Sequence, residues 1–199
     1  MGLPFFHSGV SMSLISEIDA INTMLSTIGE APITSLTGDL TADVATAQNV
    51  LTEVSRAVQG EGWDFNTFRD YTLPLDVNSK IPVPSNTLKV NVSRWPVDAV
   101  QRGGFLYNKT ENAFTFTAPV EAEIVLFLPW ADLPESAKEY IMHRAARVFL
   151  QRVVGADSLR NHSREDEYAA RAKLMEAEAQ SGNYSFLTPA VYNTPPRRY

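Results

Sequence analysis

Apolar side chains recur at helical spacing in two stretches near the start of the chain. Between residues 41 and 66, steps of three and four residues connect Val44, Ala47, Leu51, Val54 and Val58. The same rhythm precedes them at Leu14, Ile18, Ile21, Leu25 and Ile28. Each set falls on one side of a helix. Because such narrow seams need a partner, the two stretches are predicted to form an antiparallel helix pair.

Glycine and proline mark the ends of these two helices. Gly29 suits a helix C-terminus and Pro32 prevents the helix from resuming, so residues 29–33 are predicted to form a rigid turn. The second helix is expected to start at Thr41 and to end at Gly60-Glu61-Gly62, because only glycine enters left-handed backbone geometry without steric cost. The aromatic pair that follows is expected to plug the end of the bundle. The candidate structural motif comprises Gly29, Glu30, Pro32, Gly62, Trp63, Phe65 and Asn66.

Residues 67–130 have a different character, with many prolines, alternating β-branched or aromatic residues, and few charges. This composition predicts a β-rich insert of short strands, which the prolines confine to a small sheet or barrel. The expected strands cover residues 71–75, 88–93, 104–107, 114–117 and 121–128. Arg102-Gly103-Gly104-Phe105 is expected to be a hairpin turn, although it also resembles one copy of an RNA-binding Arg-Gly-Gly tract.

Two further helices are predicted after Trp130. The first begins at Leu133-Pro134-Glu135 and ends at Gly155. Its buried side is expected to consist of Ile141, Ala145, Val148, Phe149 and Val153. The last helix, residues 158–180, is mostly polar, with a thin seam of Tyr168, Ala172, Met175 and Ala179. Glu167 and Arg171 lie one turn apart on it and are expected to pair weakly.

Together these patterns predict an α+β fold. Residues 13–66 and 131–182 are expected to form a four-helix bundle-like domain, into which residues 67–130 are inserted as a small β-rich lobe. Residues 1–12 form a leader to which we assign no role, because it lacks the basic start and the apolar length of a signal peptide. Residues 183–199 are expected to be an extended tail that either forms a protein interface or folds back on its own subunit.

Composition narrows the function. The 199 residues are 44% hydrophobic and carry a net charge of -6, which disfavours a protein that grips nucleic acid over its whole surface but permits one past which DNA slides. The absence of cysteine excludes disulfides, thiolate zinc sites and cysteine nucleophiles. No apolar run approaches the roughly 20 residues that cross a bilayer, so no membrane partner is expected.

Catalytic and metal-binding patterns are weak. Glu139 and His143 share a helical face, but two ligands without a third are more simply an ordinary surface pair. Paired carboxylates beside sugar-stacking rings are typical of glycoside hydrolases. Such acids are Glu61, Asp64 and Asp70 near Trp63, and Asp132 and Glu135 near Trp130. Helix capping explains the second group equally well. We expect no catalytic residue, no metal and no cofactor, and keep glycan hydrolysis as the alternative.

A series of landmarks then runs through the chain. They are Ile28-Gly29-Glu30-Ala31-Pro32, Leu36, Gly38-Asp39, an alanine-rich helix with Arg56, Gly62-Trp63-Asp64-Phe65-Asn66, Arg102-Gly103-Gly104-Phe105 and Gly155-Ala156. In this order they resemble the tail tubular protein A family of short-tailed phages. The resemblance runs from about Leu14 to the end of the last helix, and is closest in the first two helices and around Trp63.

The resemblance implies a virion protein without catalytic activity. It would be a head-to-tail adaptor, assembled in the host cytoplasm as a ring of about twelve copies between the portal and a nozzle protein of the tail tubular protein B type. Such a ring seals the packaged genome and leaves a conduit for DNA ejection without specific DNA binding. The alternative of a tail-associated glycan hydrolase stays open, alone or as a second activity, whereas a free DNA-binding module is disfavoured by charge.

A ring requires two unlike faces on every subunit. Arginines of the third helix are expected to meet acids of a neighbour, and the end of the tail is expected to dock on the portal. The candidate interface residues are Arg144, Arg147, Arg152, Arg197, Arg198 and Tyr199. A negatively charged conduit would repel phosphate and let DNA slide. Candidates for its wall, equally well explained as a solvated face, are Glu165, Asp166 and Glu167.

Overall fold

The computed structural model describes residues 14–92, 98–155 and 160–181. These residues form four α-helices and five β-strands, in the order α1 (Glu17–Ser26), α2 (Ala42–Gln59), β1 (Thr67–Leu73), β2 (Thr87–Asn91), β3 (Ala99–Arg102), β4 (Phe105–Asn108), β5 (Val120–Leu126), α3 (Glu135–Val153) and α4 (Arg160–Ser181). The predicted mixed α+β class is confirmed. The leader and the tail, with Arg197, Arg198 and Tyr199, lie outside the described residues.

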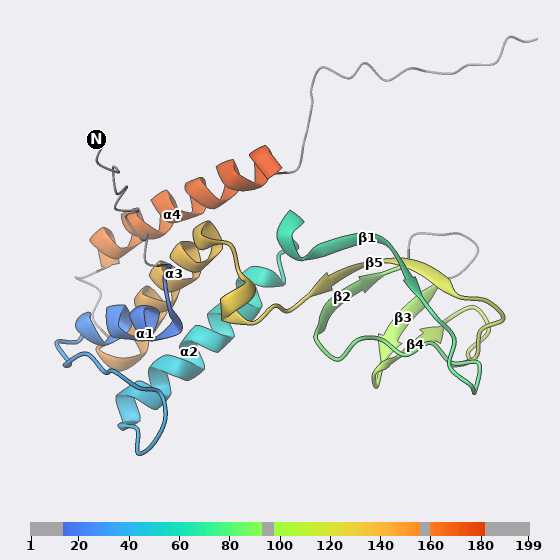
Figure 1. Ribbon diagram of the computed structural model, residues 1–199, viewed down its shortest axis with the longest axis horizontal. Helices are drawn as coiled ribbons and strands as arrows, with labels where there is room; N and C mark the ends of the chain where they lie inside the picture. The colour runs from blue at the N-terminus through green and yellow to red at the C-terminus, as the bar shows by residue number, and fades with distance from the viewer. Residues whose placement is uncertain (1–13, 93–97, 156–159, 182–199) are drawn as a thin grey trace, which may run out of the picture.

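Helix α3 is central among the helices and packs against the other three. Figure 1 shows α4 on one side of α3 and α2 on the other. All five apolar residues of the seam predicted between residues 41 and 66 are buried in the common core. Tyr140 and Phe149 of α3 are its largest fully buried side chains. Helix α2 is therefore one layer of the helical part, and α3 joins it to α4.

The turn between α1 and α2 is built as predicted. Gly29 has φ +80° and donates its N–H to the Ser26 carbonyl at 3.2 Å, while the Glu30 N–H donates to the Leu25 carbonyl at 3.1 Å. This pair of bonds is the Schellman arrangement that closes a helix end. The side chain of Asn22 then binds both the N–H and the carbonyl of Ile33, at 2.8 and 3.0 Å. The sequence pattern did not predict this second set of hydrogen bonds, which also stabilises the turn.

Several predicted core positions are wrong. Leu14 is 63% exposed and Val153 is 41% exposed, because Leu14 precedes the Ser16 cap of α1 and Val153 is the last residue of α3. In α4 the predicted seam faces outward, with Tyr168 70% exposed, and Ala170 and Leu174 are buried instead. Two apolar stripes run along this helix, and the one that packs against α3 is the one with fewer large residues.

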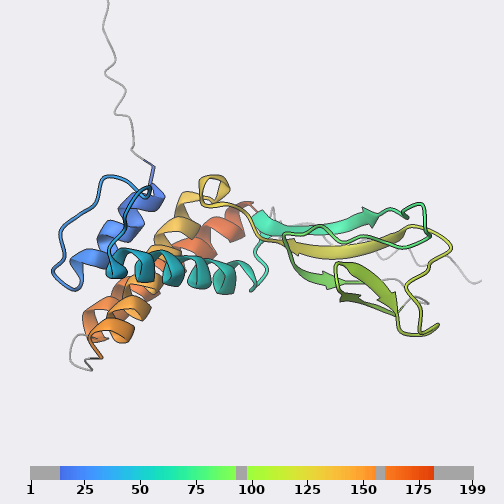
Figure 2. The same cartoon turned by 90° about the horizontal axis from the view of Figure 1, so that it is seen from below.

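The strands form two small antiparallel sheets, one in the order β1-β5-β2 and one of β3 and β4. Both sheets contribute side chains to a second apolar cluster, separate from the helical core, that includes Leu73, Leu106 and Ile124. The β3–β4 hairpin lies against the larger sheet (Figure 2). The insert is thus a small two-sheet unit between α2 and α3 in the chain.

The β3–β4 hairpin corrects two strand predictions. Gly103 and Gly104 have φ +56° and +83°, which a two-residue hairpin turn of this hand requires, so the predicted turn is confirmed. Strand β3 before it was missed. The strand predicted at 114–117 is absent, because only isolated bridges such as Lys80 with Thr115 form there. The Phe114 ring instead packs edge-on to Tyr107 at 5.0 Å between ring centroids.

Candidate functional site at the junction of helices and strands

The chain passes from α2 to β1 through a tight junction at residues 60–66. Gly60 keeps helical geometry, with φ -66°, so the expectation that it turns left-handed is wrong. Gly62 makes that turn, with φ +88°. A Cβ on Gly62 would lie 3.4 Å from a methyl group of Val125 in β5. The junction therefore needs glycine at position 62 both for its conformation and for its closeness to the sheet.

Asn66 closes this junction from the inside. Its side chain is fully buried. Its Oδ1 accepts the Trp63 N–H at 3.0 Å, and its Nδ2 donates to the carbonyls of Gln59 at 2.9 Å and Leu126 at 2.8 Å. One amide thus ties the end of α2, the junction and the end of β5 together.

Gln59 makes a second tie beside it. Its side chain is also fully buried. Its Oε1 accepts the Leu128 N–H at 2.7 Å, and its Nε2 donates to the Leu128 carbonyl at 3.1 Å and to the Ser55 hydroxyl at 3.0 Å. Sequence reasoning missed Gln59, although it continues the buried positions 51 and 55 at helical spacing. We name the side chains of Gln59 and Asn66 the amide clamp. Because both amides are fully bonded, they hold helices and strands in one geometry.

The aromatic pair of the junction lies against the helical core, as predicted. Trp63 and Phe65 are partly buried and pack on the cluster that contains α1 to α4. The Trp63 ring nitrogen donates at 2.8 Å to the Val58 carbonyl in the last turn of α2, which also accepts the Glu61 N–H at 3.0 Å. The seven residues of the candidate motif therefore occupy two places, the α1–α2 turn and this junction.

Glu61 is held by arginines from two helices. Its carboxylate accepts from Arg144 of α3 at 3.2 Å and from Arg171 of α4 at 3.3 Å. Both guanidinium groups also donate to the Tyr140 hydroxyl, at 3.0 and 3.3 Å. Burial acts to lower the pKa of Arg144, but Tyr140 and Glu61 together raise it above its ordinary value. This network fastens the junction to α3 and α4.

The other arginines of α3 also find acids of their own chain. Arg152 binds Glu53 through two bonds of 2.8 Å, and Arg147 pairs with Glu167. The predicted pair of Glu167 with Arg171 is therefore wrong, because α4 is rotated so that Glu167 faces α3. Glu167 has a side chain only 16% exposed, unlike Glu165 and Asp166, which are exposed. Whether these arginines also face a neighbour stays a prediction.

Glu135 at the start of α3 anchors the segment that leads into α1. It accepts the Ile15 N–H at 2.9 Å and pairs with the buried Lys138 at 2.8 Å. The Trp130 ring donates to the Ile15 carbonyl at 3.0 Å. Burial tends to raise the pKa of Glu135, but the bonds from Lys138 and Ile15 hold it below its ordinary value. This acid therefore has a structural task, but not the predicted one of capping the helix, because the start of α3 at Pro134 has no side-chain cap.

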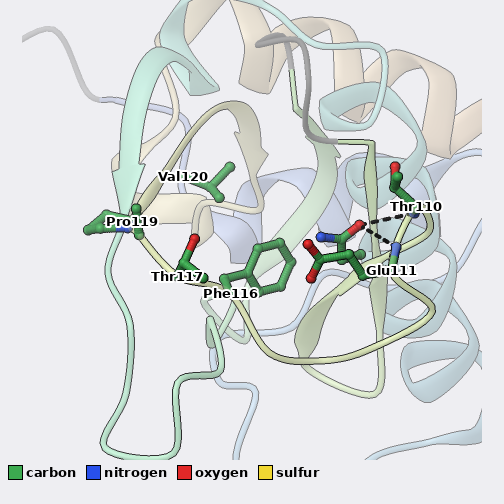
Figure 3. A pocket seen from close by; sticks show the side chains of 8 residues that line it. Thr110, Glu111, Phe116, Thr117, Pro119 and Val120 are labelled. Atoms are coloured by element: carbon green, nitrogen blue, oxygen red, sulfur yellow. Dashed lines mark hydrogen bonds between the residues drawn. The ribbon is translucent and has the colours of Figure 1, made fainter.

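Neither of two described pockets gathers the acids considered for glycan hydrolysis. One, of about 300 Å³ in the strand region, is lined by Asn108, Thr110, Glu111, Phe116, Thr117, Ala118, Pro119 and Val120. Figure 3 shows Thr110 and Glu111 on one side and Pro119 and Val120 on the other. The other pocket, of about 180 Å³, lies near Trp130 and contains Glu17. Glu61, Asp64 and Asp70 line neither.

Metal and membrane features are likewise not found in the described part. Within residues 14–92, 98–155 and 160–181, no cluster of three or more His, Asp or Glu side chains could hold a metal ion. Glu139, which was weighed with His143 as a metal ligand in the sequence analysis, instead binds Lys173 at 2.6 Å. None of the helices seen in these ranges has both the length and the apolar character to cross a membrane.

The described residues thus form helices and small antiparallel sheets that are joined by a buried amide clamp. The sequence pattern of the tail tubular proteins matches residues 18–184, which include both the helices and the strands. The chain belongs to the tail tubular protein family. It is 30% identical over 174 residues to tail tubular protein A of Klebsiella phage KP34, covering 86% of this chain and 90% of that protein. It is therefore a structural component of the phage tail that associates with other tail components.

Proposed function

We propose that this chain is the head-to-tail adaptor of a short-tailed phage. About twelve copies form a ring that joins the portal protein above to a nozzle protein of the tail tubular protein B type below. The observation that carries the proposal is the match of nearly the whole chain to tail tubular proteins, with a relative that is itself named tail tubular protein A. In this ring, residues 13–66 and 131–182 act as one bundle domain, and residues 67–130 as an inserted lobe.

The amide clamp suits this role. A subunit that transmits force between a DNA-filled head and a tail needs its two parts in a fixed relation. Gln59 and Asn66, both fully buried, tie the end of α2 to residues 126 and 128. The Glu61 network adds a second connection, to α3 and α4. The junction thus resists bending between helices and strands.

Charge supports a conduit for DNA. Residues 14–52 contain Glu17, Asp19, Glu30, Asp39 and Asp43 and no lysine or arginine. A wall of this sign repels the phosphate backbone, so DNA passes without adhering. Glu165 and Asp166, exposed on α4, remain proposed wall residues, whereas Glu167 is occupied by Arg147. Assembly of the ring in the host cytoplasm, before release of the virion, belongs to the same proposal.

A glycan hydrolase gains no support from the described residues. Glu61 is bound by two arginines, and neither of the two described pockets brings Glu61 together with the second carboxylate that glycoside cleavage needs. The adaptor role is tested in phage particles that lack this chain. We expect DNA-filled heads that carry no nozzle and lose their DNA. Heads that retain complete tails without this chain would contradict the proposal.

A further inference from the structure

Helix α4 has a second apolar stripe that the subunit's own core does not use. Its Ala170 and Leu174 are buried in the helical core, while Tyr168 is 70% exposed and Met175 is 56% exposed. Together with the exposed Ala172 and Ala179, Tyr168 and Met175 form a series in which successive members are four, three and four residues apart. They therefore lie in a straight line along the outer face, with small residues beside large ones. A seam of this spacing is typical of a helix that receives a second helix.

Helix α2 presents a complementary outer face. Among its exposed positions, which also include Ala42, Glu53 and Ala57, a line is formed by Ala45, Asn49, Thr52 and Arg56. They again keep steps of four, three and four, but with small side chains at most of them. Positions 45 and 49 leave a space between their side chains on this face, and positions 52 and 56, seven residues further on, leave a second one. Tyr168 and Met175 are also seven residues apart. Two large side chains of α4 thus match two intervals on α2, as knobs match holes.

The directions of the two helices suit a ring. Figure 1 shows α2 and α4 on opposite sides of α3, both running toward the strands. Neighbours in a ring of about twelve copies are rotated by only about 30° relative to one another. A contact between α4 of one copy and α2 of the next therefore joins helices that run in the same general direction, and the two faces are unlike, as a closed ring of identical subunits requires.

We propose that the outer stripe of α4 packs on the outer face of α2 in the neighbouring copy, and that this contact repeats around the ring. The inference rests on the proposed ring. It pairs opposite charges when Glu176 lies opposite Arg56, which places Ala172 opposite Thr52. The same register brings Arg164, about 18 Å along the helix from Glu176, to the start of α2. No lysine or arginine lies in residues 14–55 to oppose it.

Cysteine cross-linking tests this contact cleanly, because the chain contains no cysteine. Thr52→Cys and Ala172→Cys are introduced together, and tails isolated from the particles are oxidised and run on a denaturing gel. Within one subunit α2 and α4, which carry these two positions, lie on opposite sides of α3 (Figure 1), so the disulfide is expected only between copies. We expect a ladder of multimers. The control pair is Ala172→Cys with Val77→Cys, since Val77 is 99% exposed in the strand region, and it is expected to give no ladder.

A disruptive variant gives an independent measurement. Met175→Arg is expected to leave the melting temperature of the free chain unchanged, because this side chain lies outside the core, and to reduce ring yield at least tenfold in electron micrographs. Val77→Arg is the matched control and is expected to assemble normally. Rings without a ladder, or Ala172→Cys joined to the portal or nozzle instead, would overturn the contact but leave the adaptor role standing. No ring from the unmodified chain with its portal would overturn both.

Discussion

Replacing Asn66 by alanine is expected to lower the free energy of unfolding by about 3 kcal/mol, because three hydrogen bonds are lost at about 1 kcal/mol each. The substitution removes the bonds of the Asn66 side chain to the Trp63 N–H and to the carbonyls of Gln59 and Leu126. In a chain of this size, the melting temperature should fall by roughly 6 to 12 °C. Urea denaturation followed by circular dichroism and by tryptophan fluorescence measures the change in both helices and junction.

The matched control is Asn86→Ala. Asn86 also donates its side-chain amide to a carbonyl, that of Phe127 at 3.0 Å, but at an exposed site. Its loss is expected to cost about 0.5 kcal/mol or less. Asn66→Asp keeps the shape but points a carboxylate at two carbonyls, so its deficit should shrink as pH falls and the carboxyl becomes a donor. Equal losses for Asn66→Ala and Asn86→Ala would refute the amide clamp as the element that joins helices to strands.

Three further outcomes are expected. Glu135→Gln should flatten the dependence of melting temperature on pH below about pH 5. The Glu135 carboxyl, whose folded pKa is depressed, stabilises the fold above its ordinary pKa of 4.5, and this stabilisation is lost as pH falls through the folded pKa. An unchanged pH profile would contradict the anchoring of Ile15. Trp63→Ala should reduce both thermal stability and ring assembly, and a stably folded variant that assembles normally would show that the junction matters less than argued. Deleting residues 183–199 should leave the melting temperature unchanged but weaken co-sedimentation with the portal, and undiminished binding would remove the proposed docking of Arg197, Arg198 and Tyr199.

The parts of the fold that the sequence predicts best are those where one local pattern decides. The five-residue seam of α2 and the Gly29 turn depend on spacing and on glycine geometry within a few residues, and both are found as expected. The α4 stripe was misjudged because two apolar stripes compete there, and only contact with α3 selects between them. The missing strand at 114–117 has a similar origin, because strand formation requires a partner that spacing alone does not supply.

The candidate site divides in the same way. Gly62, Trp63 and Asn66 could be picked out from their order in the chain, but their partners could not. Asn66 binds Leu126 across 60 positions and Gln59 binds Leu128 across 69, and no periodicity encodes such distant contacts. The arginines of α3 show the same limit. Their positive stripe is visible in the sequence, whereas the acids that meet it come from Glu53, Glu61 and Glu167 on other elements.

The adaptor role itself is tested most directly by electron microscopy of the full chain mixed with the portal of its phage. The account predicts a ring of about twelve copies seated on the portal, with an open centre wide enough for duplex DNA. A portal that stays bare beside a monomeric, folded chain would contradict it.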